Sequence, residues 1–404
     1  MTHARSHPSN PSLGEPRIPG ALPLRVFFFM YLLCAGIMVP FFPMVLRGRG
    51  LTGTEIALVL ACTPLMHLTT PFVWGWLADR TRRPDLVAQI AVLGTALAFV
   101  PLSFSTSFAG LWVSNLVTQF FFTPLPGLSD SLAMMRVRMA NDVYGRIRLW
   151  GSVSFMLAAA TMGLLLTHRW GDKTNGPLVP LVAGAFLLLA FFVAFFVRGG
   201  QRGTRPRFSD TRRLLADRRL IFLIVVGGIH WGCTAPFHNF FGAMVQDRGF
   251  PRSVLGWSFA LSVLAELLVF FFGRSILQRA RLSTLFSITM FGSALRWSLS
   301  AWVVHPAALI AVQVLHGLTY GVFWSVSVSW LHGLVPENLR VTGQTLFTAG
   351  VLGVGNLAGV LITGQLYDWF GSLAPALWAA GGTNLLLAFV CLTVGRRMTP
   401  QTEM

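Results

Sequence analysis

The chain has 404 residues, of which 54% are hydrophobic and only 11% are charged. Soluble globular domains carry about 25% charged residues, so this composition excludes them and predicts a helical protein that crosses a membrane many times. The net charge of +17 could indicate a nucleic-acid partner, but the arginines lie in short loops between apolar runs, which is typical of loops facing anionic lipid, so we expect membrane lipid and no nucleic acid as a partner.

The chain begins with residues 1–23, a stretch rich in Pro, Ser and Arg that we expect to be a disordered cytoplasmic tail. The rest contains twelve apolar runs of the length that a membrane-spanning helix needs. The expected spans are 24–46, 56–77, 86–107, 109–134, 146–167, 178–197, 220–245, 253–273, 282–304, 307–332, 342–366 and 374–395. Prolines inside four of them predict kinks, which membrane helices tolerate, at Pro40, Pro64, Pro124 and Pro236.

The arginine-rich stretch 198–219 is the longest internal break between apolar runs, and we expect it to be a cytoplasmic loop. It separates one domain, 24–197, from a second, 220–395, and a short tail, 396–404, follows. With the N-terminus inside, the arginines concentrate in the inner loops, which predicts that both tails are cytoplasmic. We expect a monomer in a bacterial inner membrane.

Between the second and third runs, from Gly75 to Pro84, lies the sequence Gly-Trp-Leu-Ala-Asp-Arg-Thr-Arg-Arg-Pro. Taken alone, it is a basic loop with one acid. Its spacing and position resemble the loop motif of the major facilitator superfamily of transporters. That resemblance implies twelve transmembrane helices in two pseudo-symmetric six-helix halves, with a solute site between them. It also implies a conformational latch at Gly75, Asp79, Arg80 and Arg83.

The fifth run begins with Tyr-Gly-Arg-Ile-Arg-Leu-Trp-Gly-Ser, residues 144–152. This motif resembles the start of span 5 in the branch of proton symporters that contains the 3-phenylpropionic acid transporter-like proteins. More remotely, the motif also resembles the corresponding segment of lactose permease. Asp130 precedes Arg148 by 18 residues, which is the separation of a substrate-binding acid and arginine in lactose permease. The resemblance implies that Asp130 and Arg148 bind solute beside Trp150. A structural ion pair is the alternative.

Ionisable residues also lie inside three spans of the second half, namely Glu266, Arg296 and His316. An acid, an arginine and a histidine at membrane depth can relay a proton. Lactose permease has the same residue types in the matching spans, so the resemblance implies proton coupling here. Its proton-carrying Glu is replaced by Thr319, so we predict that the Glu266–His316 pair carries the proton, tuned by Arg296. A purely structural charge network is the alternative.

The seventh run contains His230, Trp231 and Asn239. We predict that they face the solute cavity, with Trp231 able to stack on a ring. A histidine inside a span can equally be a hydrogen-bonded packing residue.

No nucleotide-binding loop and no metal-ligand spacing occurs in the sequence, so we expect no cofactor, no metal and no enzymatic activity. The resemblance implies a proton-coupled symporter that takes up a small organic solute: an aromatic acid, a sugar or a nucleoside. One alternative is a proton-coupled efflux antiporter for drugs or other solutes, and another is a non-transporting membrane receptor on the same scaffold.

Overall fold

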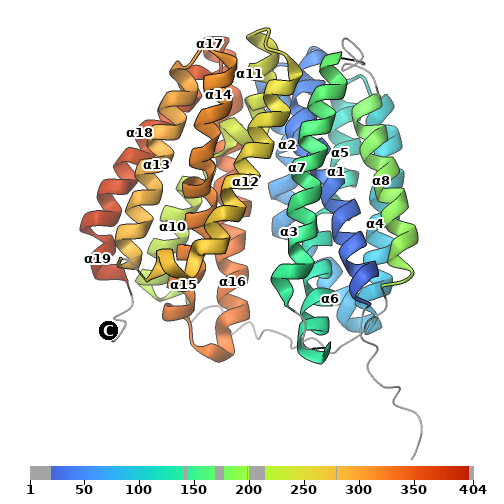
Figure 1. The fold of residues 1–404 in the computed structure, drawn as a ribbon, viewed down its shortest axis with the longest axis horizontal. Helices are drawn as coiled ribbons and strands as arrows, with labels where there is room; N and C mark the ends of the chain where they lie inside the picture. The colour runs from blue at the N-terminus through green and yellow to red at the C-terminus, as the bar shows by residue number, and fades with distance from the viewer. Residues whose placement is uncertain are drawn as a thin grey trace, which may run out of the picture.

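The computed structural model describes residues 20–140, 143–168, 177–197, 199, 214–278 and 280–399. All regular elements in these ranges are helical, and they form two adjoining bundles (Figure 1). The first bundle contains α1 (Ala21–Gly48), α2 (Gly53–Leu60), α3 (Cys62–Thr81), α4 (Pro84–Phe104), α5 (Phe108–Phe122), α6 (Leu125–Ala140), α7 (Tyr144–His168) and α8 (Leu178–Ala194).

The second bundle contains more interrupted spans, because several of its helices change type along their length. Its elements are α10 (Arg218–Gly232), η2 (Pro236–Phe240), α11 (Phe241–Asp247), α12 (Arg252–Leu277), α13 (Leu282–Trp302), α14 (Pro306–Val312), η3 (Gln313–Leu315), η4 (Gly317–Val322), α15 (Phe323–Leu334), η5 (Glu337–Leu339), α16 (Arg340–Thr348), η6 (Ala349–Gly355), α17 (Asn356–Phe370), α18 (Ala374–Thr393) and α19 (Gly395–Met398). The elements η2, η4 and η6 are π-helical, and such segments are frequent at functional sites.

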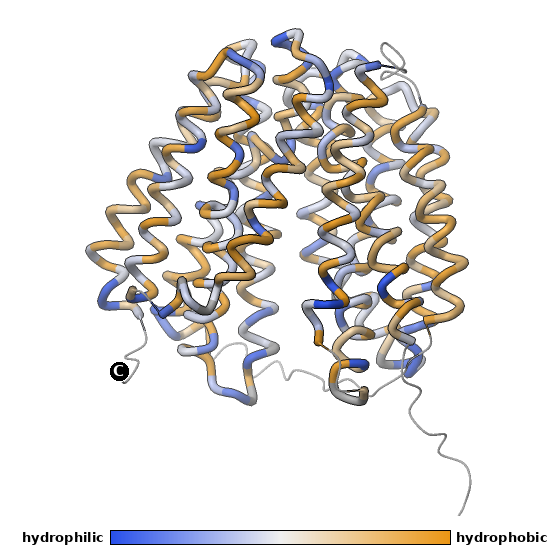
Figure 2. Tube along the Cα trace, in the orientation of Figure 1, coloured by the Kyte–Doolittle hydropathy of each residue, from blue (hydrophilic) through white to orange (hydrophobic). Residues whose placement is uncertain are grey.

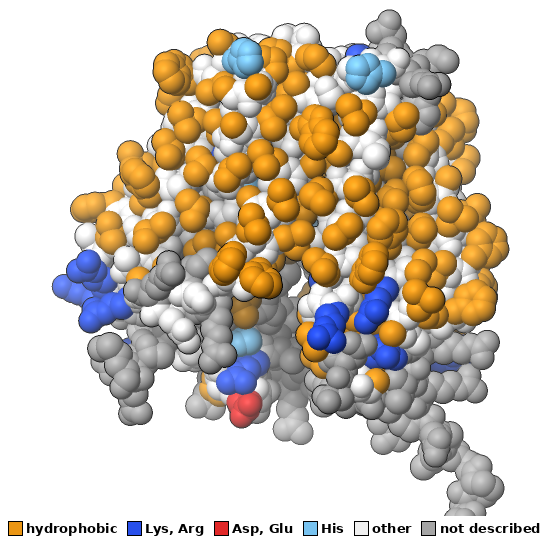
Figure 3. Space-filling model, viewed as in Figure 1, with side chains coloured by type: hydrophobic (Ala, Val, Ile, Leu, Met, Phe, Trp, Pro, Cys, Tyr) orange, Lys and Arg blue, Asp and Glu red, His pale blue; other side chains and the backbone are white. Residues whose placement is uncertain are grey.

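Eight helical stretches among the described residues are long and apolar enough to cross a membrane, and a ninth is possible if a bent pair, Gly53–Thr70 and Phe72–Ala78, forms one span. Each of the twelve predicted runs contains helix, but the count of twelve spans stays a prediction. Hydrophilic residues concentrate at the two ends of the bundles (Figure 2). A broad hydrophobic band covers the face between them (Figure 3), as expected for a surface in contact with lipid.

Two of the predicted proline kinks coincide with real breaks. Pro124 lies between α5 and α6, and Pro236 begins the π-helical segment η2. Proline has no backbone N–H and its ring clashes with the preceding turn, so it interrupts the hydrogen-bond ladder of a helix. Helix α1 in contrast continues through Pro40.

Glycines allow the closest contacts between helices. A Cβ at Gly256 in α12 would overlap the carbonyl of Ala159 in α7, so only a glycine permits this approach between the two halves. A Cβ at Gly359 would likewise overlap the backbone of Gly232, which explains the glycine-rich sequence of α17 as a packing face.

The two halves are bonded together at one end, which we call the closed end. Arg47 Nε lies 3.2 Å from Asp247 Oδ1, and the hydroxyl of Tyr367 donates to the same carboxylate. Asp368 accepts hydrogen bonds from the backbone N–H groups of Gly53 and Thr54, at 2.5 and 2.7 Å. Since these N–H groups begin α2, the carboxylate also interacts favourably with the helix dipole.

At the opposite end, which we call the open end, the helices of the two halves diverge (Figure 1). The start of α1 and the helix α19 both lie there. The hydrogen bonds that join described residues of the two halves lie at the closed end. Besides those named above, the Thr54 hydroxyl donates to Asp368 Oδ2 at 2.5 Å, and the N–H of Ser253 donates to Thr167 Oγ1 at 2.8 Å. The two halves are therefore held together at the closed end and diverge toward the end where α1 begins and α19 lies (Figure 1).

Candidate functional site

Four polar residues of the first half form what we call the first-half cluster: Tyr31 of α1, Asp130 of α6, and Tyr144 and Arg148 of α7. The hydroxyl of Tyr144 donates to Asp130 Oδ1 at 2.8 Å. The guanidinium of Arg148 lies within electrostatic range of the other three residues. The structure thus brings the predicted pair Asp130 and Arg148 into one cluster, although the hydrogen bond to Asp130 comes from Tyr144.

The neighbouring residues on α7 explain how Arg148 fits. A Cβ at Gly151 would overlap the Leu32 side chain and lie 3.1 Å from the Arg148 guanidinium, so glycine leaves room for both. Trp150 is 46% exposed and has no ring contact with the part of the chain that the structure describes. The structure therefore does not bring Trp150 into the first-half cluster.

Arg296 of α13 anchors a second polar group, which we call the second-half network. It is fully buried, and its Nε and one terminal nitrogen donate to Gln313 Oε1 at 3.0 and 2.8 Å. The other terminal nitrogen lies 2.8 Å from both His316 Nδ1 and Thr319 Oγ1. Its charge also lies 4.3 Å from the centre of the Phe237 ring. Within the described ranges, no carboxylate forms an ion pair with Arg296.

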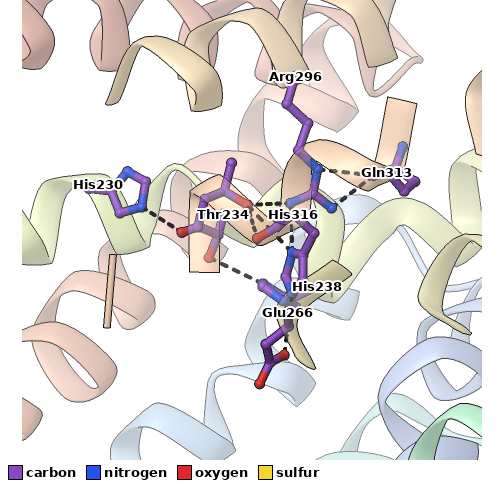
Figure 4. A network of polar contacts seen from close by, with 8 residues as sticks. His230, Thr234, His238, Glu266, Arg296, Gln313 and His316 are labelled. Atoms are coloured by element: carbon purple, nitrogen blue, oxygen red, sulfur yellow. Dashed lines mark hydrogen bonds and ion pairs between the residues drawn. The ribbon is translucent and has the colours of Figure 1, made fainter. Parts of the chain in front are cut away.

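The donor and acceptor chemistry of this network assigns the tautomer of His316. A guanidinium has only donors, so Nδ1 of His316 accepts from Arg296 and carries no proton. The ring proton of the neutral imidazole is then on Nε2, which lies 3.9 Å from Glu266 Oε2. Figure 4 shows His316 between Arg296 at one end and Glu266 at the other. The His316 ring thus faces a cation on one side and the carboxyl group on the other.

A local change of helix type positions the His316 side chain next to Arg296. It lies at the junction of the 3-10 segment η3 and the π-helical segment η4. Such a junction changes the direction of successive side chains along a span. As a result, Gln313, His316 and Thr319 all point at the same guanidinium.

The first-half cluster and the second-half network interact electrostatically across the interface between the halves. Arg148 also lies within electrostatic range of Tyr320 and Glu266 in the second half. The Tyr320 ring stacks on His316, with centroids 5.2 Å apart and planes inclined by 26°. The two groups that the sequence predicts separately therefore form one polar centre, in which Arg148 lies within electrostatic range of one acid from each half, Asp130 and Glu266.

The three predicted residues of the seventh run have different surroundings. His230 is fully buried, with Nδ1 2.7 Å from Asn384 Oδ1 and Nε2 3.1 Å from the carbonyl of Thr319. Both ring nitrogens are occupied by the protein, as in the packing alternative. Trp231 and Asn239 instead line a cavity between the halves.

The predicted latch lies at the open end. Gly75 has nothing near its Cα that a Cβ would touch, and Arg80 lies over the ring of Trp76, 5.4 Å from its centroid. Arg83 Nε lies 3.6 Å from Asp85 Oδ1. The side chain of Asp79 lies outside the described residues. The prediction that Gly75 allows a neighbouring helix to approach closely therefore applies to a conformation in which the open end is closed.

Three members of the polar centre, Tyr31, Tyr144 and Tyr320, were not predicted as site residues. A usable signal exists, because the chain has only four tyrosines beside 34 phenylalanines. A hydroxyl inside an apolar span needs a polar partner, so rare tyrosines in such spans indicate where polar groups gather.

The family follows from comparison with known proteins. The model of the MFS_1 like family matches residues 21–375. The chain belongs to this family of the major facilitator superfamily. It is 24% identical to the maltose permease of Geobacillus stearothermophilus, over 92% of this chain and 91% of the permease. It is 26% identical to an Escherichia coli (strain K12) protein named "Probable 3-phenylpropionic acid transporter", over 86% of this chain and 91% of that protein.

The solved structure of the nucleoside transporter NupG has the same fold, with a TM-score of 0.81 at 16% identity, over 93% of this chain and 99% of that one. The predicted family and all-α major facilitator fold are therefore confirmed. The chain is a multi-pass membrane protein from a family of solute transporters. Because the names of its relatives cover sugars, nucleosides and an aromatic acid, the solute has to be inferred from the site.

Proposed function

We propose that this protein is a secondary active symporter that takes up a small organic solute together with a proton, by alternating access. The observation that carries the proposal is Glu266, a carboxyl group inside a membrane span that faces His316 of its own half and Arg148 of the other. A titratable group at membrane depth that faces both halves can link its protonation to their rearrangement.

The second-half network supports Glu266 as the residue that gains and loses the proton. His316 accepts a hydrogen bond from Arg296 through Nδ1. A second proton on this ring would break that bond and place two cations side by side, which is strongly unfavourable away from water. His316 therefore acts as a neutral, oriented hydrogen-bond donor toward Glu266. Of the predicted Glu266–His316 pair, we propose that Glu266 alone carries the transported proton.

The position of Arg148 suggests how proton and solute binding are coupled. When Glu266 is ionised, it competes with Asp130 for the charge of Arg148. Protonation of Glu266 ends this competition and leaves Arg148 and Asp130 as a neutral pair. Such a pair presents a fork of donors beside acceptor oxygens and suits the hydroxyl groups of a solute. In this mechanism the proton binds first and prepares the solute site.

The distribution of charge supports an inward-open conformation in a bacterial inner membrane. Arginine side chains gather at the open end in both halves (Figure 3), and basic residues are enriched on the cytoplasmic side. The open end then faces the cytoplasm, and both tails lie there. The closed end, with Arg47 and Asp247, faces outward. We propose that a single chain suffices for transport, because the polar centre forms within one chain.

The test uses purified protein in weakly buffered proteoliposomes, with external pH and solute uptake recorded together. The solute panel contains maltose, a nucleoside and 3-phenylpropionate. Symport predicts external alkalinisation when the transported solute is added. Acidification indicates antiport, and binding without flux indicates a receptor.

The variant Glu266→Gln sharpens this test. We expect it to abolish proton movement and uphill accumulation while solute exchange between equal pools persists, because the amide imitates a permanently protonated carboxyl group. The matched control is Glu337→Gln, which removes an exposed acid paired with Arg340 at the open end and should leave coupling unchanged. Intact uphill accumulation in Glu266→Gln would contradict the proposal.

A further inference from the structure

A cavity of about 230 Å³ lies between the halves, beside the polar centre. Its apolar wall comes mainly from α1, and its polar lining comprises Thr63, Gln119, His238, Asn239 and Asn356. No Lys, Arg, Asp or Glu is among the described residues that line it. A cavity between the halves that offers only neutral polar groups differs in chemistry from the charged centre beside it.

Three of these polar groups are amides, and their hydrogen-bonding capacity is largely unused. Gln119 Oε1 is buried and has no partner in the described structure, while its Nε2 lies 3.4 Å from Asn115 Oδ1. Asn239 and Asn356 are partly exposed and line the same cavity, and no side-chain hydrogen bond joins either of them to another described residue. Leaving a buried polar atom such as Gln119 Oε1 unpaired costs about 1–3 kcal/mol. A cavity that Gln119 shares with the partly exposed Asn239 and Asn356 of the other half therefore indicates a ligand that pairs with these amides.

One side of the cavity is aromatic. The rings of Trp231 and His238 stack at a centroid distance of 5.8 Å and an angle of 21°. Pro236 lies between these two residues in the chain and begins η2, which contains His238. His238 in turn meets His316 edge to face, at 5.9 Å. A flat or ring-shaped solute in the cavity would pack against these rings. Through His238 it would be close to His316, the residue that faces the proposed proton carrier Glu266.

We propose that Gln119, Asn239 and Asn356 form the recognition subsite for an uncharged, ring-containing solute that carries adjacent hydrogen-bond donors and acceptors. Sugar hydroxyls and the amide edge of a nucleobase share this chemistry. This inference names the solute class of the proposed transport function and rests on it. Each amide offers two donors and one acceptor group, so the three can pair with neighbouring polar atoms of the solute from both halves at once.

The same chemistry disfavours a carboxylate. An ionised carboxylate moved from water into a cavity lined only by neutral groups loses several kcal/mol of solvation without gaining a cation. The two central arginines are already engaged, because Arg148 interacts electrostatically with Asp130 and Glu266, and Arg296 is hydrogen-bonded within the second-half network. The subsite therefore selects against aromatic acids, one of the three solute classes that the sequence leaves open.

The experiment measures equilibrium binding of solutes to the purified full-length protein. The panel contains maltose, uridine, and the matched pair 3-phenylpropionamide and 3-phenylpropionate, which differ in charge but hardly in shape. The variants are Gln119→Leu and Asn356→Leu. Gln246→Leu is the matched control, because Gln246 Oε1 is also buried without a partner but Gln246 is not among the residues lining the cavity.

We expect a neutral member of the panel to bind, the amide to bind more tightly than the acid, and each cavity variant to raise the Kd of the neutral solute about tenfold, the loss of roughly one hydrogen bond. Gln246→Leu should leave Kd unchanged. Binding of 3-phenylpropionate alone, an unchanged Kd in both cavity variants, or binding of no panel member overturns the inference. A solute that binds as expected but enters proteoliposomes without a proton instead refutes only the proposed coupling.

Discussion

The two central arginines, Arg148 and Arg296, show how the same side chain acquires different roles. Arg148 is partly exposed and lies among two acids and three tyrosines. Arg296 is fully buried, and its hydrogen bonds go to neutral acceptors on a single span. A group with several competing partners can change partners during a transport cycle, whereas one whose bonds are saturated is fixed. We therefore assign switching to the first-half cluster and orientation of the proton site to the second-half network.

The largest effect is expected from Arg296→Lys. Lysine keeps the charge but lacks the planar fork, so it cannot serve Gln313, His316 and Thr319 together. Each acceptor left unpaired costs about 1–3 kcal/mol. We expect a clear fall in Tm, measured by tryptophan fluorescence in detergent, together with loss of proton-driven uptake. A variant as stable and as active as the wild type would show that the network is not rigid.

A smaller and different effect is expected from Arg148→Lys, which is the matched substitution in the other half. Because Arg148 is less buried and shares its partners, Tm should change little. Solute affinity should fall about tenfold, since a bidentate donor is replaced by a point charge. Titration of binding with the transported solute measures this. If Arg148→Lys destabilises the protein as much as Arg296→Lys, the assignment of a switching role to Arg148 and a fixed structural role to Arg296 is wrong.

The smallest effect is expected at the closed end, from Asp247→Asn. The pair Arg47–Asp247 is about one-third exposed, and exposed ion pairs contribute about 0–1 kcal/mol. Loss of this pair should therefore raise the ratio of molecules whose closed end has opened to molecules whose closed end is intact, but only several-fold. The measurement uses spin labels at Phe104→Cys and Val304→Cys, two exposed positions near the closed end. In Asp247→Asn, the distance between the two labels should show an additional population at longer separation.

Arg340→Gln is the control for this measurement, because it removes an exposed ion pair with Glu337 at the other end of the molecule. It should leave the distance distribution between the two labels unchanged. An unchanged distribution in Asp247→Asn as well would mean that the glycine contacts between α7 and α12, and not the ion pair, hold the closed end together.

Sequence reasoning located the helices well and the polar contacts less well. Spans follow from runs of apolar residues, so each predicted range contains helix, and Pro124 and Pro236 mark real breaks. The motif carrying Asp130 and Arg148 identified two residues that do lie together. The same reasoning could not separate His230, whose ring nitrogens both face the protein, from Trp231 and Asn239, which line a cavity. Local sequence does not say which side of a kinked span faces inward.

What the sequence by itself determined is the class: an all-helical membrane protein of the major facilitator superfamily, with a short set of ionisable residues inside its spans. That much follows from local properties, namely hydropathy and motif spacing. Only the tertiary structure decided that Arg148 lies within electrostatic range of acids from both halves, that His316 is held as an acceptor by Arg296, and that Gln119 faces one cavity with Asn239 and Asn356. These facts depend on contacts between residues far apart in the chain, which helix breaks and glycine packing set.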